Sequence, residues 1–213
     1  MCNASTTDGC GDAAEVQIGA YGSAAVFDPQ ADTVYVENFL STSISVVNGA
    51  TCNALNHSGC DQEPRVLATG IDPAPFGYNS ATQTLYVSSQ DTNFAWVLDG
   101  SKCNATRTDG CTKNAPTTPT EKGPSGLDIN PNTQTPYVAN QSGNTVSVID
   151  ASACNRHQLA GCNQTWQTPP VGSSPFRVSI NKTTNSIYVA GLDGTVSIIN
   201  GATCNAGVNS SCN

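Results

Sequence analysis

Apolar positions in this chain fall in short runs that alternate with polar residues, and the runs recur about every 51 residues. The most regular run is centred on a tyrosine next to a valine. It occurs four times, as VYVEN, LYVSS, PYVAN and IYVAG around Tyr35, Tyr86, Tyr137 and Tyr188. A turn-forming Asp or Asn precedes each run, and a further apolar run follows each, as in ISVVNG and VSIING. Segments rich in Val, Ile and Tyr and bounded by Asn, Asp, Gly and Pro predict β-strands joined by tight turns.

A weaker fourth run completes each period, as in PRVLATG and WQTPPVG, and no stretch shows a helical period. Four antiparallel strands in about 50 residues form the blade of a β-propeller. The sequence therefore predicts an all-β chain, one repeat domain over 1–213, with about four four-stranded antiparallel blades. The expected blades are 21–70, 71–122, 123–172 and 173–213, the last completed by a strand at 13–20. A β-sandwich is the alternative, but repeated copies of one meander argue against Greek-key crossings.

Both ends of the chain lie in the same phase of the repeat, inside a loop bounded by two cysteines. A ring of four blades closed by the strand at 13–20 would carry two such loops at one junction. Three other arrangements follow. In the first, the chain is an arc of a larger propeller. In the second, it pairs with a second copy to close a ring, and in the third, it joins further copies head to tail in a filament. Further copies of the chain are the expected partners.

The strings YVAN at 137–140 and TVSVID at 145–150 resemble the YVTN-repeat family of β-propellers. The resemblance extends over all four periods and is weakest in the second, where Ser89 replaces the asparagine. It implies a propeller fold and export, because YVTN-like propellers occur in secreted and surface-layer proteins. Similar blades also build lactonase-like and lyase-like enzymes. The motif is structural and implies no catalytic residue here, and the cysteine loop departs from the plain repeat.

The ten cysteines form five pairs with C-x7-C spacing, one pair in each repeat. The pairs are Cys2 with Cys10, Cys52 with Cys60, Cys103 with Cys111, Cys154 with Cys162, and Cys204 with Cys212. Ten exposed free thiols would be a liability, and a zinc site usually has closer cysteines. Local disulfides fit best, and each short loop closure contributes roughly 2–3 kcal/mol. Such bonds persist in oxidising compartments, which favours an extracellular or cell-surface location.

Composition and charge argue against two classes of partner, nucleic acids and the membrane interior. The formal net charge is −8 with only eight Lys and Arg, so nucleic-acid binding is not expected. No apolar run approaches the length of a membrane-spanning helix, and no membrane insertion is expected. No signal peptide is recognisable, so secretion implies a longer precursor. Seven N-x-S/T sequons are candidate glycosylation sites, at Asn3, Asn56, Asn104, Asn140, Asn163, Asn181 and Asn209.

No catalytic, cofactor-binding or metal-binding residues are predicted. Nucleophile elbows, phosphate-binding loops and zinc-protease motifs do not occur in the sequence, and the two histidines lie in different cysteine loops. The two tryptophans, Trp96 and Trp166, are candidate contact surfaces, because Trp96 stands where the other repeats have serine. Packing between blades is the alternative for both.

These patterns predict a secreted, non-enzymatic propeller that acts as an extracellular surface, adhesion or self-assembling scaffold, because near-identical repeats carry no catalytic asymmetry. Two alternatives remain. The chain is a fragment of a lactonase-like or lyase-like propeller enzyme, or it is a module that binds carbohydrate or protein through Trp96.

Overall fold

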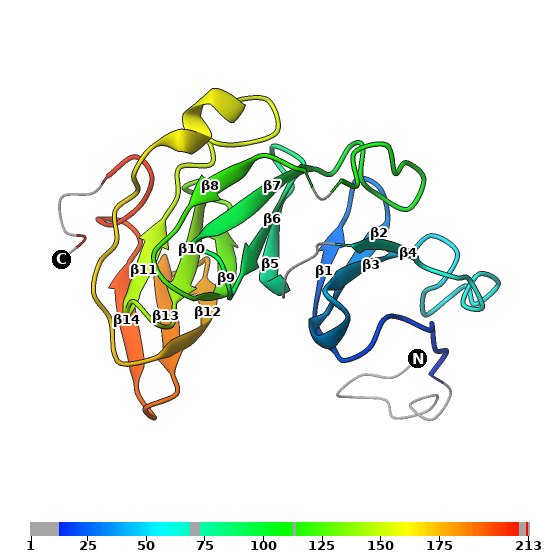
Figure 1. Ribbon diagram of the computed structural model, residues 1–213, viewed down its shortest axis with the longest axis horizontal. Helices are drawn as coiled ribbons and strands as arrows, with labels where there is room; N and C mark the ends of the chain where they lie inside the picture. The colour runs from blue at the N-terminus through cyan, green and yellow to red at the C-terminus, as the bar shows by residue number, and fades with distance from the viewer. Residues whose placement is uncertain (1–12, 69–72, 113, 209–211, 213) are drawn as a thin grey trace.

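The computed structural model describes residues 13–68, 73–112, 114–208 and 212, and these residues form four antiparallel sheets (Figure 1). The first sheet contains β1 (Gly22–Asp28), β2 (Thr33–Asn38), β3 (Ser43–Asn48) and β4 (Arg65–Ala68). The second contains β5 (Pro73–Asn79), β6 (Thr84–Ser89), β7 (Phe94–Asp99) and β8 (Thr117–Pro119). The third contains β9 (Pro124–Asn130), β10 (Thr135–Asn140) and β11 (Thr145–Val148), and the fourth contains β12 (Pro175–Asn181), β13 (Ser186–Gly191) and β14 (Val196–Asn200). Two short 3-10 helices, η1 (Phe39–Ser41) and η2 (Leu159–Asn163), lie in the described connections.

Each sheet is a meander in which strands adjacent in sequence pair with one another. The predicted all-β, propeller-type blades are therefore confirmed. The third sheet departs from four full strands, because its outer strand is reduced to two isolated bridges, Thr145 to Pro170 and Val148 to Gln167. The cause lies in the sequence of this segment, since Pro169 and Pro170 have no N–H to donate to a ladder.

The turn between the first two strands of each blade is built by one repeated side chain. In the first blade, Asp28 Oδ1 accepts the N–H of Gln30 at 2.9 Å, and in the third blade Asn130 Oδ1 accepts the N–H of Asn132 at 3.0 Å. The same bond is made by Asn79 and Asn181. A residue of positive φ ends each of these turns, at Asp32, Gln83, Gln134 and Asn185. This Asx turn explains why the repeat always has Asp or Asn at this position.

The hydrophobic core lies between the sheets as three separate clusters, one for each pair of neighbouring blades. The cluster between the first and second blades joins Tyr35 and Ile44 to Leu85 and Trp96. The repeated tyrosine lies on the middle strand of its sheet, and Tyr35, for example, pairs with Val26 on β1 and Val46 on β3. The tyrosine therefore reaches the next sheet from the centre of its own.

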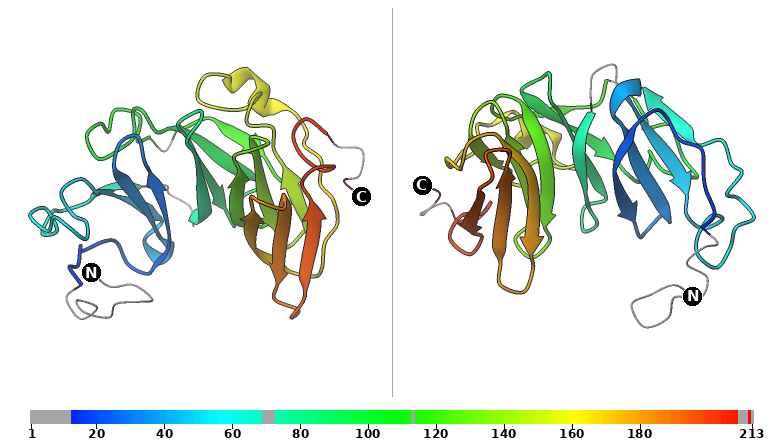
Figure 2. Two further views of the ribbon diagram at one scale, coloured as in Figure 1. Left: turned by 180° about the vertical axis from the view of Figure 1, so that it is seen from behind. Right: turned by 90° about the horizontal axis from the view of Figure 1, so that it is seen from below.

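The four sheets fan out in an open arc, with the first and last sheets at opposite ends (Figure 2). The prediction that a strand at 13–20 completes the last blade is wrong. Residues 13–18 have no regular secondary structure, and the Gly19 N–H bonds to Ser45 Oγ on β3 at 3.2 Å. Glu121 and Gly172 make the same bond to Ser147 and Ser197, so Gly19 marks the entry to the first blade, and in the described structure β14 pairs only with β13. A strand that closed the ring would have to cross to the far end of the arc.

Candidate functional site: the blade junctions and terminal blade faces

Neighbouring blades are joined by the same hydrogen bond at every junction. The hydroxyl of the repeated tyrosine donates to the carbonyl of the first cysteine in the next blade. These bonds link Tyr35 to Cys103, Tyr86 to Cys154, and Tyr137 to Cys204, the last at 2.7 Å. All three tyrosines are fully buried, and burial raises the pKa of Tyr137 to about 12. The neutral phenol therefore remains a donor through the neutral pH range.

A second repeated bond lies beside the first and runs in the opposite direction. The backbone N–H two residues after the cysteine donates to a threonine hydroxyl on the preceding blade. These bonds join Ala105 to Thr33 at 2.9 Å, Arg156 to Thr84 at 3.2 Å, and Ala206 to Thr135 at 3.0 Å. Each cysteine loop thus supplies one acceptor and one donor, and the preceding blade supplies their complements.

The cysteine loops have the local disulfides that the spacing predicts. The bonds Cys52–Cys60, Cys103–Cys111, Cys154–Cys162 and Cys204–Cys212 are all formed, while Cys2 and Cys10 lie outside the described residues. The asparagine after each first cysteine closes the same loop. The amide of Asn104 donates to the Gly100 carbonyl at 2.8 Å, and Asn155 and Asn205 make the equivalent bond. Disulfide and asparagine together hold in place the carbonyl and N–H that meet the neighbouring blade.

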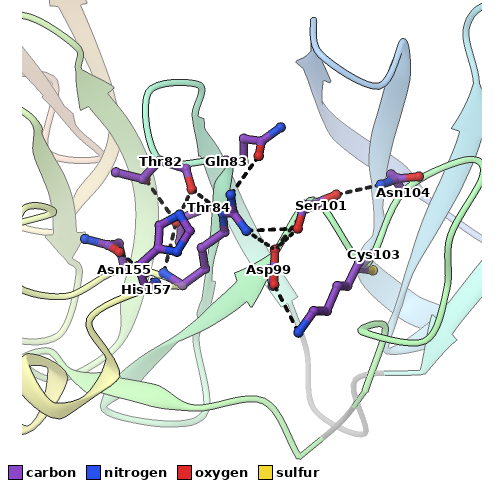
Figure 3. A network of polar contacts seen from close by, with 12 residues as sticks. Thr82, Gln83, Thr84, Asp99, Ser101, Cys103, Asn104, Asn155 and His157 are labelled. Atoms are coloured by element: carbon purple, nitrogen blue, oxygen red, sulfur yellow. Dashed lines mark hydrogen bonds and ion pairs between the residues drawn. The ribbon is translucent and has the colours of Figure 1, made fainter.

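The junction between the second and third blades carries an additional ion pair, shown in Figure 3. The Arg156 guanidinium donates to the Thr82 carbonyl at 2.7 Å, to Gln83 Oε1 at 2.8 Å and to Asp99 Oδ1 at 3.3 Å. Burial alone would raise the pKa of Asp99, but the hydrogen bond from Ser101 and the charge of Arg156 outweigh it, so its pKa lies below its usual value. Among the described residues, no other junction contains an ion pair between blades.

The outward face of the last blade exposes the side chains that the other junctions bury. Ile198 is 66% exposed, whereas its equivalents Val46, Val97 and Val148 are at most 4% exposed. Tyr188 is 38% exposed, although Tyr35, Tyr86 and Tyr137 are fully buried. Ser186 Oγ donates to the Thr184 carbonyl, as Thr135 Oγ1 does to the Thr133 carbonyl. The Ser186 hydroxyl is therefore oriented like the Thr135 hydroxyl that accepts the junction bond. In the described structure, no blade covers this face.

The opposite face of the first blade carries the complementary groups. Its cysteine loop presents the Cys52 carbonyl and the Ala54 N–H in the positions that Cys103 and Ala105 occupy one blade later. Cys52 is half-buried and Ala54 is exposed, whereas Cys103 is 1% exposed. Phe27, on the same face, is 49% exposed. The two ends of the arc are therefore the two unpaired halves of one repeated junction.

Both tryptophans lie inside the blade junctions, which agrees with packing between blades rather than with an exposed contact surface. Trp96 is 6% exposed and packs in the cluster between the first and second blades. Trp166 is 9% exposed, and its indole N–H donates to Thr118 Oγ1 at 2.7 Å. An aromatic side chain at a serine position looked like a break in a polar face, but that face is turned toward the neighbouring blade.

The sequons differ in accessibility. The side chains of Asn56, Asn163 and Asn181 are exposed. Asn104 and Asn140 are buried and their amide nitrogens are engaged within the blades, so these two candidate sites are not accessible in the folded chain. Sugar attachment would replace one amide hydrogen and would need solvent around it. Asn3 and Asn209 lie outside the described residues.

No group of three His, Cys, Asp or Glu side chains that could hold a metal ion occurs among the described residues. His57 and His157 are exposed and lie in different loops. The described part of the chain contains no helix that is long and apolar enough to cross a membrane.

Comparison with known proteins extends the description of the fold. No family model matches the chain, and no curated protein matches it. Among solved structures, it is similar to hydrazine synthase from Kuenenia stuttgartiensis, with a TM-score of 0.64 and 17% sequence identity. The match covers 88% of this chain and 48% of that chain, so this chain spans about half the length of that structure. At this identity the likeness shows the fold alone, and membership of the YVTN family stays a prediction.

Proposed function

We propose that this chain is a non-enzymatic, extracellular β-propeller scaffold that self-associates head to tail through its terminal blade faces. The main support for this proposal is that the last blade exposes the side chains that every internal junction buries. The first blade in turn exposes the cysteine loop through which every internal junction is bonded. The occupant of each terminal face is the opposite face of a second copy.

The hydrogen-bonding groups at the two ends support this pairing. Tyr188 would donate to the Cys52 carbonyl of the second copy, and the Ala54 N–H would donate to Ser186 Oγ. Both bonds have three internal precedents in the same chain. The exposed Val196 and Ile198 would be removed from water, as Ile44 and Val46 are at the first junction. Burial of such side chains contributes about 1.5–3 kcal/mol each.

Head-to-tail contacts are heterologous, so they close into a ring when the rotation allows it and otherwise continue as a filament. Two arcs of four blades give a ring of eight, which lies within the known range of propellers. We therefore favour a closed two-copy ring. In a larger propeller formed by one longer polypeptide, further blades of that polypeptide would cover the same two faces.

Two features support the extracellular setting. The four described disulfides indicate an oxidising environment. The YVTN-like strings extend over all four repeats, and the exposed surface is rich in Ser, Thr and Asn. A role as a fragment of a propeller enzyme is the alternative, and the resemblance to hydrazine synthase is too remote in sequence to favour it.

Sedimentation equilibrium and light scattering over a concentration series test the proposal. We expect a particle of twice the 21.9 kDa chain mass. Ile198→Asp should abolish association, because it places a charge in the buried centre of the new junction. Leu159→Asp is the matched control, since Leu159 is exposed at 40% in a loop whose junction is already filled. A monomer at every concentration would refute self-association, and open-ended growth would replace the ring by a filament.

A further inference from the structure

A pocket of about 260 Å³ lies on the inner side of the arc and receives residues from all four blades. Glu37 comes from the first blade, Gln90 from the second, Ser125 from the third and Arg177 from the fourth. The central axis of a propeller is where several blades can place unlike side chains around one ligand. This pocket belongs to neither terminal face.

Glu37 is a buried carboxylate whose second oxygen has no partner. The side chain is 1% exposed, and Oε2 accepts no hydrogen bond from the described residues. Burial raises the pKa of this carboxyl, while a hydrogen bond from Ser23 and the charge of Arg177 act in the opposite direction. The equivalent positions in the other blades are Ser88, Ala139 and Ala190. An unpaired buried carboxylate oxygen is costly, so its presence calls for a donor that reaches it from the pocket.

Arg177, from the fourth blade, supplies the opposite charge in the pocket lining. Its guanidinium lies 4.2 Å from the centre of the Phe176 ring, and Nη1 makes long contacts of 3.2 and 3.4 Å to the carbonyls of Phe176 and Ser125. No ion pair within 4.0 Å joins Arg177 to Glu37 among the described residues. Most of the guanidinium N–H groups thus remain available to an acceptor in the pocket.

Both charged residues of the pocket depart from the repeat. In the other blades, the position of Arg177 is occupied by Ala24, Pro75 and Gly126. The remaining wall is largely apolar, with Tyr21, Phe39 and Pro75 among its lining residues. The pocket therefore combines a carboxylate, a guanidinium and an apolar surface.

We propose that this pocket binds a free α-amino acid with an apolar side chain, whose ammonium group is held by Glu37 and whose carboxylate is held by Arg177. Arginine recognises carboxylates through paired hydrogen bonds. The ammonium group supplies both the hydrogen bond and the charge that Glu37 lacks. A neutral sugar would supply hydrogen bonds but would leave the buried carboxylate charge uncompensated.

The ligand would connect the two ends of the arc, because Glu37 is on the first blade and Arg177 is on the last. Binding that requires both blades in place stabilises the folded arc by an amount that increases with the logarithm of the ligand concentration once this exceeds Kd. Amino-acid binding should therefore raise the melting temperature, independently of whether copies associate.

Isothermal titration calorimetry with L-phenylalanine tests the proposal. Two analogues each lack one charge: N-acetyl-L-phenylalanine has no ammonium group, and phenethylamine has no carboxylate. We expect saturable binding of L-phenylalanine and affinities at least about tenfold lower for both analogues. Glu37→Gln should weaken L-phenylalanine binding by at least about tenfold while reducing the preference for it over N-acetyl-L-phenylalanine. Glu63→Gln is the matched control, because Glu63 is an exposed carboxylate outside this pocket.

Near-UV circular dichroism of each variant confirms that it is folded before its binding is measured. The proposal is overturned if L-phenylalanine shows no saturable heat up to about 10 mM. It is also overturned if Glu37→Gln binds like the wild type, or if D-glucose binds in a Glu37-dependent manner while L-phenylalanine does not.

Discussion

Substitution of Tyr137 by Phe removes a single hydroxyl from the junction between the third and fourth blades. Tyr137 and its acceptor residue Cys204 are both 0% exposed, and the hydroxyl donates to the carbonyl at 2.7 Å. Phenylalanine fills almost the same space but leaves the carbonyl without its donor, and water has no access to replace it. A buried polar group left unsatisfied costs about 1–3 kcal/mol. For a chain of this size, each kcal/mol lowers the melting temperature by about 2–4 °C, so we expect a decrease of roughly 2–12 °C.

Thermal unfolding followed by circular dichroism under non-reducing conditions measures this effect, at a protein concentration low enough to keep copies apart. Tyr188→Phe is the matched control, since Tyr188 is 38% exposed and its hydroxyl meets no further blade in the described chain. Its effect on the unfolding free energy should stay within about 0.5 kcal/mol. Equal melting temperatures for the two variants would refute the view that the repeated tyrosine hydroxyl holds the blades together.

Three further predictions concern other parts of the chain. Burial raises the pKa of Glu37 above its ordinary value of 4.5, so the fold loses stability as the pH rises from about 4.5 to the higher folded-state pKa, and the loss stays constant above that; Glu37→Gln should raise the melting temperature near pH 7 and leave it unchanged well below pH 4.5. Replacing Cys154 and Cys162 together by serine should lower the unfolding free energy by about 2–3 kcal/mol in denaturant titrations, because the loop is no longer closed. Glycopeptide mapping after expression in a glycosylating host should find sugar on the exposed Asn163 and none on the buried Asn140.

The blade itself could be predicted from the sequence because its determinants are local and repeated. Three features each depend on residues within one repeat: the Asx turn at Asp28, the tyrosine strand and the disulfide spacing. Because the repeat occurs four times, the shared pattern could be distinguished from variation at single positions. The sequence predicts a full outer strand in the third blade, but only two isolated bridges form, because two prolines remove ladder donors from a segment that otherwise has the strand pattern. The end of the segment 13–20 follows the repeat, because Gly19 bonds to Ser45 as Glu121 does to Ser147 and Gly172 to Ser197. Its pairing with the last blade would require a contact between the two ends of the arc, which no single repeat encodes.

The central pocket was missed although its signal was visible in the sequence. Glu37 and Arg177 each stand where the other repeats have small or neutral residues, but they are 140 positions apart and lie at different points of the repeat. The differences between repeats therefore looked scattered. Only the arc shows that the inner end of β12 and the end of β2 line the same pocket. Departures from a repeat become informative once their positions in the blade are compared in space.

The internal junctions also indicate how strong the contact between copies should be. The repeated hydrogen bonds join a tyrosine hydroxyl to a backbone carbonyl and a backbone N–H to a hydroxyl. They can therefore form even when the apolar side chains packed around them, the apolar filling of the junction, differ. That filling differs between junctions, because Trp96 accompanies Ala115 at the first junction, whereas Trp166 accompanies Ser147 at the second. The first blade has Ser45 and Pro64 at these two positions, so a junction between copies would contain neither indole. Aromatic side chains dominate the burial energy of such interfaces. Association between copies should therefore be weaker than the first two internal junctions, and it should reverse on dilution while each arc stays folded.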